Sequence, residues 1–380
     1  MITFSTSLSE TVPLNSYNNN VVSFTSDTVG TLVLAEITFS GVTIQLTPDV
    51  NGVFTYNFIE IFKAIINDNY FRDEIDGLSL VSPYFIIEDT DLFKELVISY
   101  KVIFDNDDEE TTSKTYKLLK SVIQLEDHRK GLINSNNPNI SILLPFTQAS
   151  SQTYHASYFT GFPFDFSLYS DAARTIKIKD VNTLHEVSVP VVEGVNRVFW
   201  SVGGTDWTLE DELPMIEGVN EFEISFVGQA PEEVLTLFMT KYQDACGTLL
   251  KWFNNSGAWS YFLFNELEQA RKVKSLGEFE QDFENVEDTS EVRTNYGSEQ
   301  QDSVKLYAVN LDINQKKQLN SIIGSPKIYR YLNDSFQEMT SSDWISEGVK
   351  DGTFKTEKTN RNSYEFELTL EKNKANTITL

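Results

Sequence analysis

The sequence contains few of the residues that most often carry catalysis or bind metals. Its 380 residues include one cysteine and three histidines. A single cysteine cannot form an intramolecular disulfide, so nothing indicates an oxidising compartment. No His-x-x-His or Cys-x-x-Cys spacing predicts a metal site. Because His128, His155 and His185 lie far from Cys246 in sequence, we expect Cys246 to be a packed thiol rather than a nucleophile, and we predict no cofactor.

Several motifs and segments are also absent. There is no phosphate-binding loop, no dinucleotide-binding glycine motif and no G-x-S-x-G. No run of about 18 apolar residues predicts a membrane-spanning helix. The opening residues MITFSTSLSE lack a basic region and an apolar region, so we expect no secretory signal and synthesis in the cytosol.

Basic residues are scarce relative to acidic ones. The chain has 30 Lys and Arg against 56 Asp and Glu, a formal charge of −26. Such a charge repels phosphate backbones and anionic membrane surfaces, so neither nucleic acid nor membrane is an expected partner. It favours solubility, which suits a protein made in many copies before assembly.

The residues that are plentiful predict a mostly β chain with minor α. Apolar residues make up 40% and aromatic residues 13%, rich in Phe and Tyr, which favour half-buried pleated surfaces. We predict three antiparallel sandwich-like or barrel-like parts with a few short helices. They are a β domain over 1–132, an immunoglobulin-like β-sandwich over 138–232, and an α+β assembly domain over 233–380.

The N-terminal part alternates strand and helix patterns. After a turn at Asn51-Gly52, the spacing of apolar residues predicts an amphipathic helix over 57–67, with Asn57 as N-cap and Glu60 closing a capping box. The acidic run 105–114 departs from the calcium-loop pattern, because Glu110 stands where glycine is required. We therefore predict a solvated hairpin tip there.

The middle part contains one internal repeat. PVVEGVNRVFWSV and PMIEGVNEFEISF share Glu-Gly-Val-Asn followed by alternating apolar residues. We expect Gly194 and Gly218 to adopt special backbone angles, and Asn196 and Asn220 to form the turn into the next strand. Two copies are too few for a solenoid.

The C-terminal part begins with strand-like residues 233–243 and includes a polar arm over 275–303, a short helix that Asn314 caps, and a half-exposed strand at SYEFELTLE.

Between 246 and 264, CGTLLKWFNNSGAWSYFLF predicts a hairpin whose two faces are both apolar. Such a hairpin is covered on both sides by its own domain or by another subunit. The residues expected to act as packing or interface anchors are Trp252, Trp259, Tyr261 and Phe264.

The tryptophans leave an alternative open. Trp200, Trp207, Trp252 and Trp259 could form a platform that stacks on sugars, although Trp and Tyr more often lie in cores or interfaces. A glycoside hydrolase is a third hypothesis, and it requires two carboxylates facing each other across a cleft.

The hairpin also resembles a segment of tail proteins from bacteriophages that infect Bacteroidetes. The matching residues are Asp244, Cys246, Leu250, Lys251, Trp252, Gly257, Trp259, Tyr261, Leu263 and Phe264. The C-terminal segment LNSIIGSPKIYRYLND also resembles the end of those tail proteins, and the N-terminal strands with the 57–67 helix resemble their N-terminal part. The resemblance implies a structural virion protein of the tail tip, hub or baseplate, without catalysis. It also implies assembly in the host cytoplasm, self-association as a homo-oligomeric ring, and contacts with other phage tail proteins.

Overall fold

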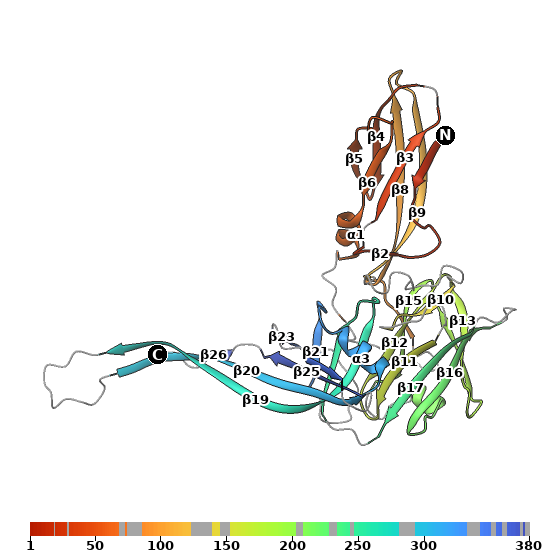
Figure 1. Cartoon of the computed structure of the whole chain (residues 1–380). Helices are drawn as coiled ribbons and strands as arrows, with labels where there is room; N and C mark the ends of the chain where they lie inside the picture. The colour runs from red at the N-terminus through yellow and green to blue at the C-terminus, as the bar shows by residue number, and fades with distance from the viewer. Residues whose placement is uncertain are drawn as a thin grey trace.

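The computed structural model is built mostly of β-strands (Figure 1). It describes residues 1–18, 20–28, 30–67, 73, 86–122, 139–144, 153–202, 208–227, 234–243, 247–280, 293–332, 343–350, 355–358, 363–372 and 375–376.

The N-terminal part is an elongated sandwich of two sheets. Three strands form one sheet in the order β1 (Ile2–Thr6), β3 (Val21–Ser26) and β6 (Phe54–Asn57). The second sheet has the order β2 (Leu14–Asn15), β9 (Glu109–Leu119), β8 (Phe93–Phe104), β4 (Leu32–Phe39) and β5 (Val42–Leu46). Alternating residues of both sheets meet in one aromatic-rich core. The acidic run forms the β8–β9 hairpin tip, as predicted.

Helix α1 (Ile59–Ile66) closes this sandwich with its apolar stripe. Phe62 and Ile66 are buried in the N-terminal core. The expected capping box is wrong, because the N-cap position is Phe58 rather than Asn57. Asn57 Oδ1 accepts from the Ile59 amide at 3.1 Å, while Glu60 pairs with Lys63 at 3.0 Å.

The middle part is a second sandwich. Its smaller sheet has the order β10 (Ile140–Ile142), β12 (Phe164–Ser170), β15 (Gly194–Ser201) and β7 (Ile86–Glu88). Its larger sheet has the order β11 (Thr153–Phe159), β17 (Val234–Tyr242), β16 (Gly218–Phe226), β13 (Arg174–Asp180) and β14 (Glu186–Val191). The short helix α2 (Leu209–Glu212) joins β15 to β16.

Two strands lie outside the sequence boundaries expected for this sandwich. β7 belongs to the range 1–132 but pairs with β15. β17 was expected to open the C-terminal domain, yet it pairs with both β11 and β16. Each strand supplies hydrogen bonds that a sheet edge would otherwise lack. The boundary expected at 232/233 therefore falls before a strand of the middle sandwich rather than after it.

The Glu-Gly-Val-Asn repeat gives the same local structure twice, as expected. Gly194 and Gly218 have φ values of +106° and +93°. Asn196 accepts from the amide of Val192 at 2.9 Å and donates back to the carbonyl of Val192 at 2.9 Å. Asn220 makes the same two bonds with Ile216, at 2.9 and 2.8 Å. Each asparagine thus fixes a turn that directs the chain into a new strand.

The C-terminal part is a nine-stranded sheet. Its main path is β22 (Trp344–Ser346), β21 (Ile328–Tyr331), β18 (Thr248–Phe253), β19 (Trp259–Glu280), β20 (Arg293–Leu311), β25 (Tyr364–Glu371) and β23 (Gly348–Val349). β24 (Lys355–Lys358) pairs with β25, and β26 (Ala375–Asn376) pairs with β20. On β25, Phe366, Leu368 and Leu370 are buried while Glu365, Glu367 and Glu371 are not, as predicted.

Helix α3 (Ile313–Asn320) packs near β11 and β25. Its N-cap is Asp312 rather than the expected Asn314. Asp312 accepts from the Gln315 amide at 2.7 Å, and Gln315 Oε1 accepts from the Asp312 amide at 3.0 Å. The reciprocal capping box explains why the helix starts before the expected cap.

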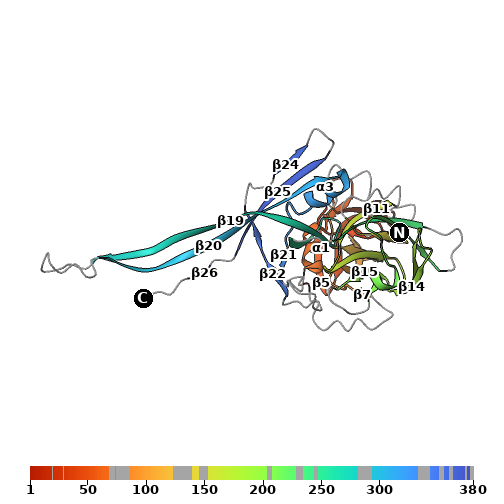
Figure 2. The same ribbon diagram turned by 90° about the horizontal axis from the view of Figure 1, so that it is seen from below.

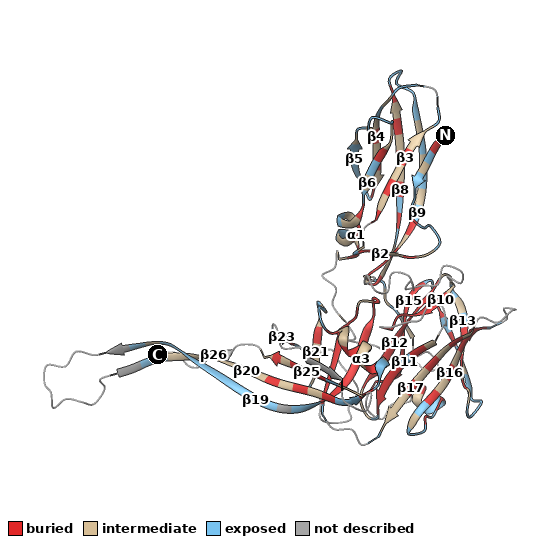
Figure 3. Cartoon of the chain, viewed as in Figure 1, coloured by how far each residue is buried: buried red, intermediate tan, exposed pale blue. Residues whose placement is uncertain are grey.

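Among the described residues, the buried apolar side chains form two clusters rather than three. Figure 3 shows where the buried residues lie along the strands. One cluster lies in the N-terminal sandwich. The other runs without a break from the middle sandwich into the C-terminal sheet. These two parts therefore share a hydrophobic core.

The polar region expected to form an arm does so as a two-stranded ribbon. β19 and β20 leave the body together and extend far beyond it (Figures 1 and 2). Residues 265–276 of β19 are exposed, except for Leu267, whose side chain lies outside the described set. Residues 281–292, which join the two strands, lie outside the described residues.

Candidate functional site: the central hairpin, its buried charges and the arm

The β18–β19 hairpin lies at the centre of the molecule. Trp252, Trp259, Tyr261 and Phe264 are each at most 1% exposed. The Trp252 indole donates to Ser321 Oγ at 2.8 Å. Both apolar faces are thus covered by the same chain, so these four side chains pack inside it and have no surface left for another subunit.

The turn of this hairpin connects it to the N-terminal sandwich. Asn255 accepts a backbone hydrogen bond from Val122 at 2.9 Å, and Ser256 Oγ donates to the Leu144 carbonyl at 3.0 Å. Gly257 has φ of +89°, and a Cβ at this position would lie 2.6 Å from the Lys120 carbonyl oxygen. The close approach requires glycine.

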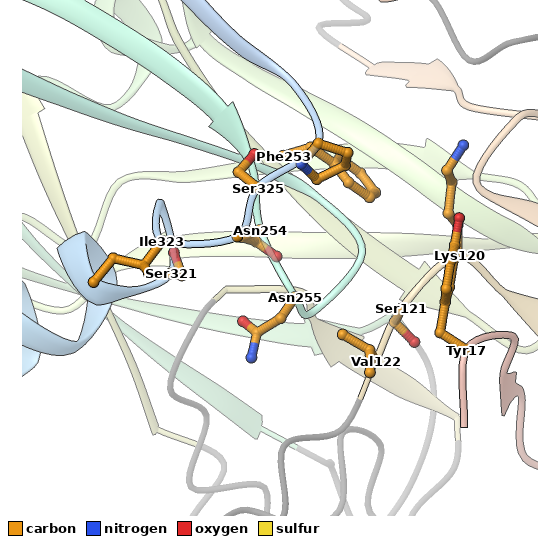
Figure 4. Close-up of a pocket in the computed structure, with 12 residues that line it drawn as sticks. Tyr17, Lys120, Ser121, Val122, Phe253, Asn254, Asn255, Ser321, Ile323 and Ser325 are labelled. Carbon is orange, nitrogen blue, oxygen red and sulfur yellow. The ribbon is translucent and has the colours of Figure 1, made fainter. Parts of the chain in front are cut away.

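A pocket of about 450 Å³ opens beside this turn (Figure 4). Tyr17 and Lys120 line it from the N-terminal sandwich, and Phe253 and Asn254 line it from the hairpin. Burial lowers the pKa of Lys120 to about 8. The pocket marks where the chain leaves the first sandwich and meets the C-terminal sheet.

A buried ionic cluster joins the middle sandwich to the hairpin. Arg197 on β15 binds Asp165 on β12 through two bonds, Nε to Oδ2 at 3.0 Å and Nη2 to Oδ1 at 2.8 Å. Asp73 accepts from Arg197 Nη1 and from Lys251 Nζ, both at 2.5 Å. Tyr261 OH donates to Asp165 Oδ1. Two positive and two negative side chains thus balance inside the protein.

Burial and mutual attraction oppose each other in this cluster. Burial raises the pKa of Asp73, but Arg197 and Lys251 outweigh it, so the pKa lies below its ordinary value. Burial lowers the pKa of Lys251 to about 8, against the attraction of Asp73. Burial also raises the pKa of nearby Asp89 to about 6. Asp73, Arg197 and Lys251 each have an oppositely charged partner, which favours their charged forms.

Aromatic rings surround the Lys251 ammonium. Its Nζ lies 4.0 Å from the Trp344 ring centre, 5.4 Å from that of Trp259 and 5.3 Å from that of Tyr329. Cation–π attraction adds to the ion pair with Asp73. Lys251 therefore fastens β18 to Asp73 and to the C-terminal strands.

Sequence reasoning did not identify this cluster. The signal was present in LLKWF and VNRVFW, where Lys251 and Arg197 interrupt apolar strands. A charge in such a position needs a buried partner. The partners Asp73 and Asp165 could not be chosen from 56 acidic residues without the fold.

The residues considered for catalysis, metals and sugars are dispersed. His155 stacks on Phe238 with ring centres 5.3 Å apart and His185 is exposed, while His128 and Cys246 lie outside the described residues. Within the described ranges, no group of three His, Cys, Asp or Glu residues is arranged to hold a metal. The described part of the chain also contains no helix that is long and apolar enough to cross a membrane.

The sugar-stacking platform lacks accessible rings. Trp200, Trp252 and Trp259 are each at most 1% exposed, and Trp207 lies outside the described residues. A stacking platform needs exposed faces, so these three tryptophans cannot provide one in this conformation.

Much of the arm's strand edge is unpaired among the described residues. β18 pairs with β19 from Trp259 to Phe264 only, and beyond Phe264 the outer edge of β19 has no strand partner among the described residues. The outer edge of β20 pairs with β25 from Ser303 to Leu311 and with β26 at Glu299 and Gln300, while from Arg293 to Ser298 it has no strand partner among the described residues. Backbone donors and acceptors along a free edge can pair with another strand.

No protein-family model matches the chain, and no curated protein matches it. Solved structures match it weakly. Fibronectin(III)-like modules of CbhA from Clostridium thermocellum are 8% identical and cover 64% of this chain and 95% of their own, with a TM-score of 0.20. An adhesin with which an Antarctic bacterium binds ice is 9% identical and covers 99% of this chain and 72% of its own, with a TM-score of 0.18. A tetra-tandem repeat from the extending region of a large adhesion protein is 11% identical and covers 91% of this chain and 64% of its own, with a TM-score of 0.21. At these scores the matches carry no argument about function.

Proposed function

We propose that the chain is a structural protein of a bacteriophage tail, at the tip, hub or baseplate. It assembles in the host cytoplasm with copies of itself and with neighbouring tail proteins, and it carries out no catalysis. The sequence resemblance described above supports the tail assignment. The β19–β20 arm supports assembly.

The arm is the observation that carries this proposal. A two-stranded hairpin alone is marginally stable in water, and a long free edge promotes association. The arm also exposes large apolar side chains that a separate monomer would leave in water. Val273 is 56% exposed, Leu276 51% and Tyr296 47%. Contact with another molecule would cover both the edge and these side chains.

The body suits a passive, rigid role. The middle sandwich and the C-terminal sheet share one core, and the Asp73–Arg197–Lys251 cluster ties them together. The turn at Asn255 ties the N-terminal sandwich to the same hairpin. A subunit fastened in this way can hold its arm in a fixed direction.

The test is the native mass of the purified chain by light scattering over a range of concentrations, together with electron microscopy of the particles. A matched variant replaces residues 271–302 by Asn-Gly, which can close the ribbon because Ala270 lies opposite Ser303. We expect the full chain to form oligomers and the shortened chain to stay monomeric with an unchanged circular dichroism spectrum. A full chain that remains monomeric and binds immobilised glycans would instead support the carbohydrate-binding alternative.

A further inference from the structure

The free edge of β19 has a regular segment between two irregularities. The pairing register of β19 with β20 shifts between Glu266 and Glu268 and again between Ser275 and Gly277. From Glu268 to Ser275 the strand is regular, and its side chains are exposed. A regular, exposed edge is what another strand needs in order to pair.

Three of the four charges of this segment have no ion-pair partner among the described residues. Among the described residues, Glu268, Lys272 and Lys274 make no ion pair, whereas Arg271 is bound to Asp302 at 2.8 Å. Alternate residues of a regular strand point to the same face. One face of the ribbon therefore carries Glu268, Ala270, Lys272 and Lys274, which lie opposite Lys305, Ser303, Gln301 and Glu299 on β20. This face therefore carries an acidic residue followed by two basic ones.

We propose that two copies of the chain pair antiparallel through the free β19 edges of their arms, with Ala270 on the two-fold axis. This register sets Glu268 opposite Lys272 of the second copy, and the symmetry repeats that pair. Gln269 then faces Arg271. No like charges are directly opposite between Glu268 and Lys272.

The neighbouring registers fit less well. A two-fold axis at Arg271 would set two arginines opposite each other, and an axis at Lys272 would set two lysines opposite each other. Like charges directly opposite destabilise a strand pair. A two-fold axis perpendicular to the sheet must pass between the two copies of one residue. Only then do directly opposite side chains lie on the same face of the sheet. An axis at Gln269 would set Glu268 opposite Ala270 and pair no opposite charges within the regular segment. Within 268–275, only the axis at Ala270 pairs opposite charges without setting like charges opposite each other.

The inference rests on the proposed self-assembly and names its contact. The formal charge of −26 makes whole copies repel one another, but salt screens this repulsion beyond about 8 Å at physiological ionic strength. At the arm, the basic residues Lys272 and Lys274 meet the acidic residues of the other strand. The contact links copies in pairs, so a closed ring needs a second contact elsewhere on the body.

Charge exchange tests the register in the full chain. Glu268→Lys and Lys272→Glu each set like charges opposite each other, and we expect each to weaken dimerisation at least tenfold. The double variant restores the opposite pairs and should dimerise like the original chain. An equimolar mixture of the two single variants should dimerise too, because each supplies what the other needs. Sedimentation velocity measures all four samples.

Cysteine cross-linking tests the axis. In a Cys246→Ser background, Ala270→Cys should form a disulfide-linked dimer under air oxidation, because residues on the axis face each other at about 4.5–5.5 Å between Cα atoms. Val273→Cys is the control and should not cross-link. Equal cross-linking of both, or single charge variants that dimerise normally, would overturn the arm pairing while leaving the proposed function intact. A full chain that is monomeric at all concentrations would overturn both.

Discussion

Removal of the Asp73 carboxylate should show how strongly the buried cluster holds the body together. In Asp73→Asn, the carboxylate that lies 2.5 Å from both Lys251 and Arg197 becomes a neutral amide, which keeps one oxygen and places an NH2 donor where the other was. Two positive charges then remain with one carboxylate, Asp165. Loss of one member of a buried ionic group costs about 3–5 kcal/mol, because it leaves a charge uncompensated. We expect the free energy of unfolding to fall by that amount.

Lys251→Met should cost less than Asp73→Asn. The pKa of Lys251 is lowered to about 8 from 10.5, so the charged ammonium is already disfavoured at this site by roughly 3 kcal/mol at about 1.4 kcal/mol for each pKa unit. Methionine removes that penalty and still fills the space between the rings. The double variant Asp73→Asn/Lys251→Met leaves the balanced pair of Arg197 and Asp165. It should therefore be more stable than Asp73→Asn alone.

Guanidinium unfolding followed by tryptophan fluorescence measures this double-mutant cycle. The Trp344 ring centre lies 4.0 Å from Lys251 Nζ, so one of the chain's five tryptophans reports on the cluster. We expect a coupling energy of at least about 2 kcal/mol between the two positions. If Asp73→Asn costs less than about 1 kcal/mol, or if the two effects are additive, the cluster does not join the two parts of the body.

Three further predictions concern single positions. Gly257→Ala should lower the melting temperature more than Gly324→Ala, because both glycines have positive φ (+89° and +85°) but only the first also meets a backbone oxygen, at 2.6 Å; equal losses would contradict this reasoning. The pKa of Asp89 is raised to about 6, so the folded state binds this proton more tightly than the unfolded state does. The contribution of Asp89 to stability should therefore fall as the pH rises from about 4 to 6. Thermal unfolding at stepped pH measures this, and Asp89→Asn should remove that part of the pH dependence; an unchanged pH dependence in the variant would contradict it. Asn196→Ala and Asn220→Ala should each cost about 1–3 kcal/mol in guanidinium unfolding, since each removes matching hydrogen bonds from a buried turn; a large difference between them would show that the two turns are not equivalent.

Local patterns in the sequence predicted local structure well. The alternation in SYEFELTLE, the apolar stripe of α1 and the repeated Glu-Gly-Val-Asn turns all depend on neighbouring residues, and the structure confirms them. The start of α1 was missed because its N-cap position is Phe58, a residue that capping rules do not favour, and the start of α3 because two polar residues near it could act as the cap. Asp312 competes with Asn314, and only the reciprocal bond with Gln315 decides between them.

Long-range pairing was beyond the reach of sequence patterns. Nothing in residues 86–88 or 234–242 distinguishes a strand of one sandwich from a strand of the next, because both segments have the apolar residues that are typical of any buried strand. The two-faced apolar hairpin was recognised, but its coverage could come from its own chain or from another subunit. The structure shows its own chain surrounding it: β11 and β12 of the middle sandwich pack against β19, Trp252 bonds to Ser321 just after α3, and β21 extends the sheet at the edge of β18.

Strand β19 runs unbroken from the buried Trp259 to Glu280 near the end of the arm. Tension applied at the tip therefore travels along covalent backbone into the hydrophobic interior. There it acts parallel to the β18–β19 strands, so their hydrogen bonds bear the load in shear, all at once rather than one after another. The protrusion cannot be pulled away without unfolding the body to which it belongs.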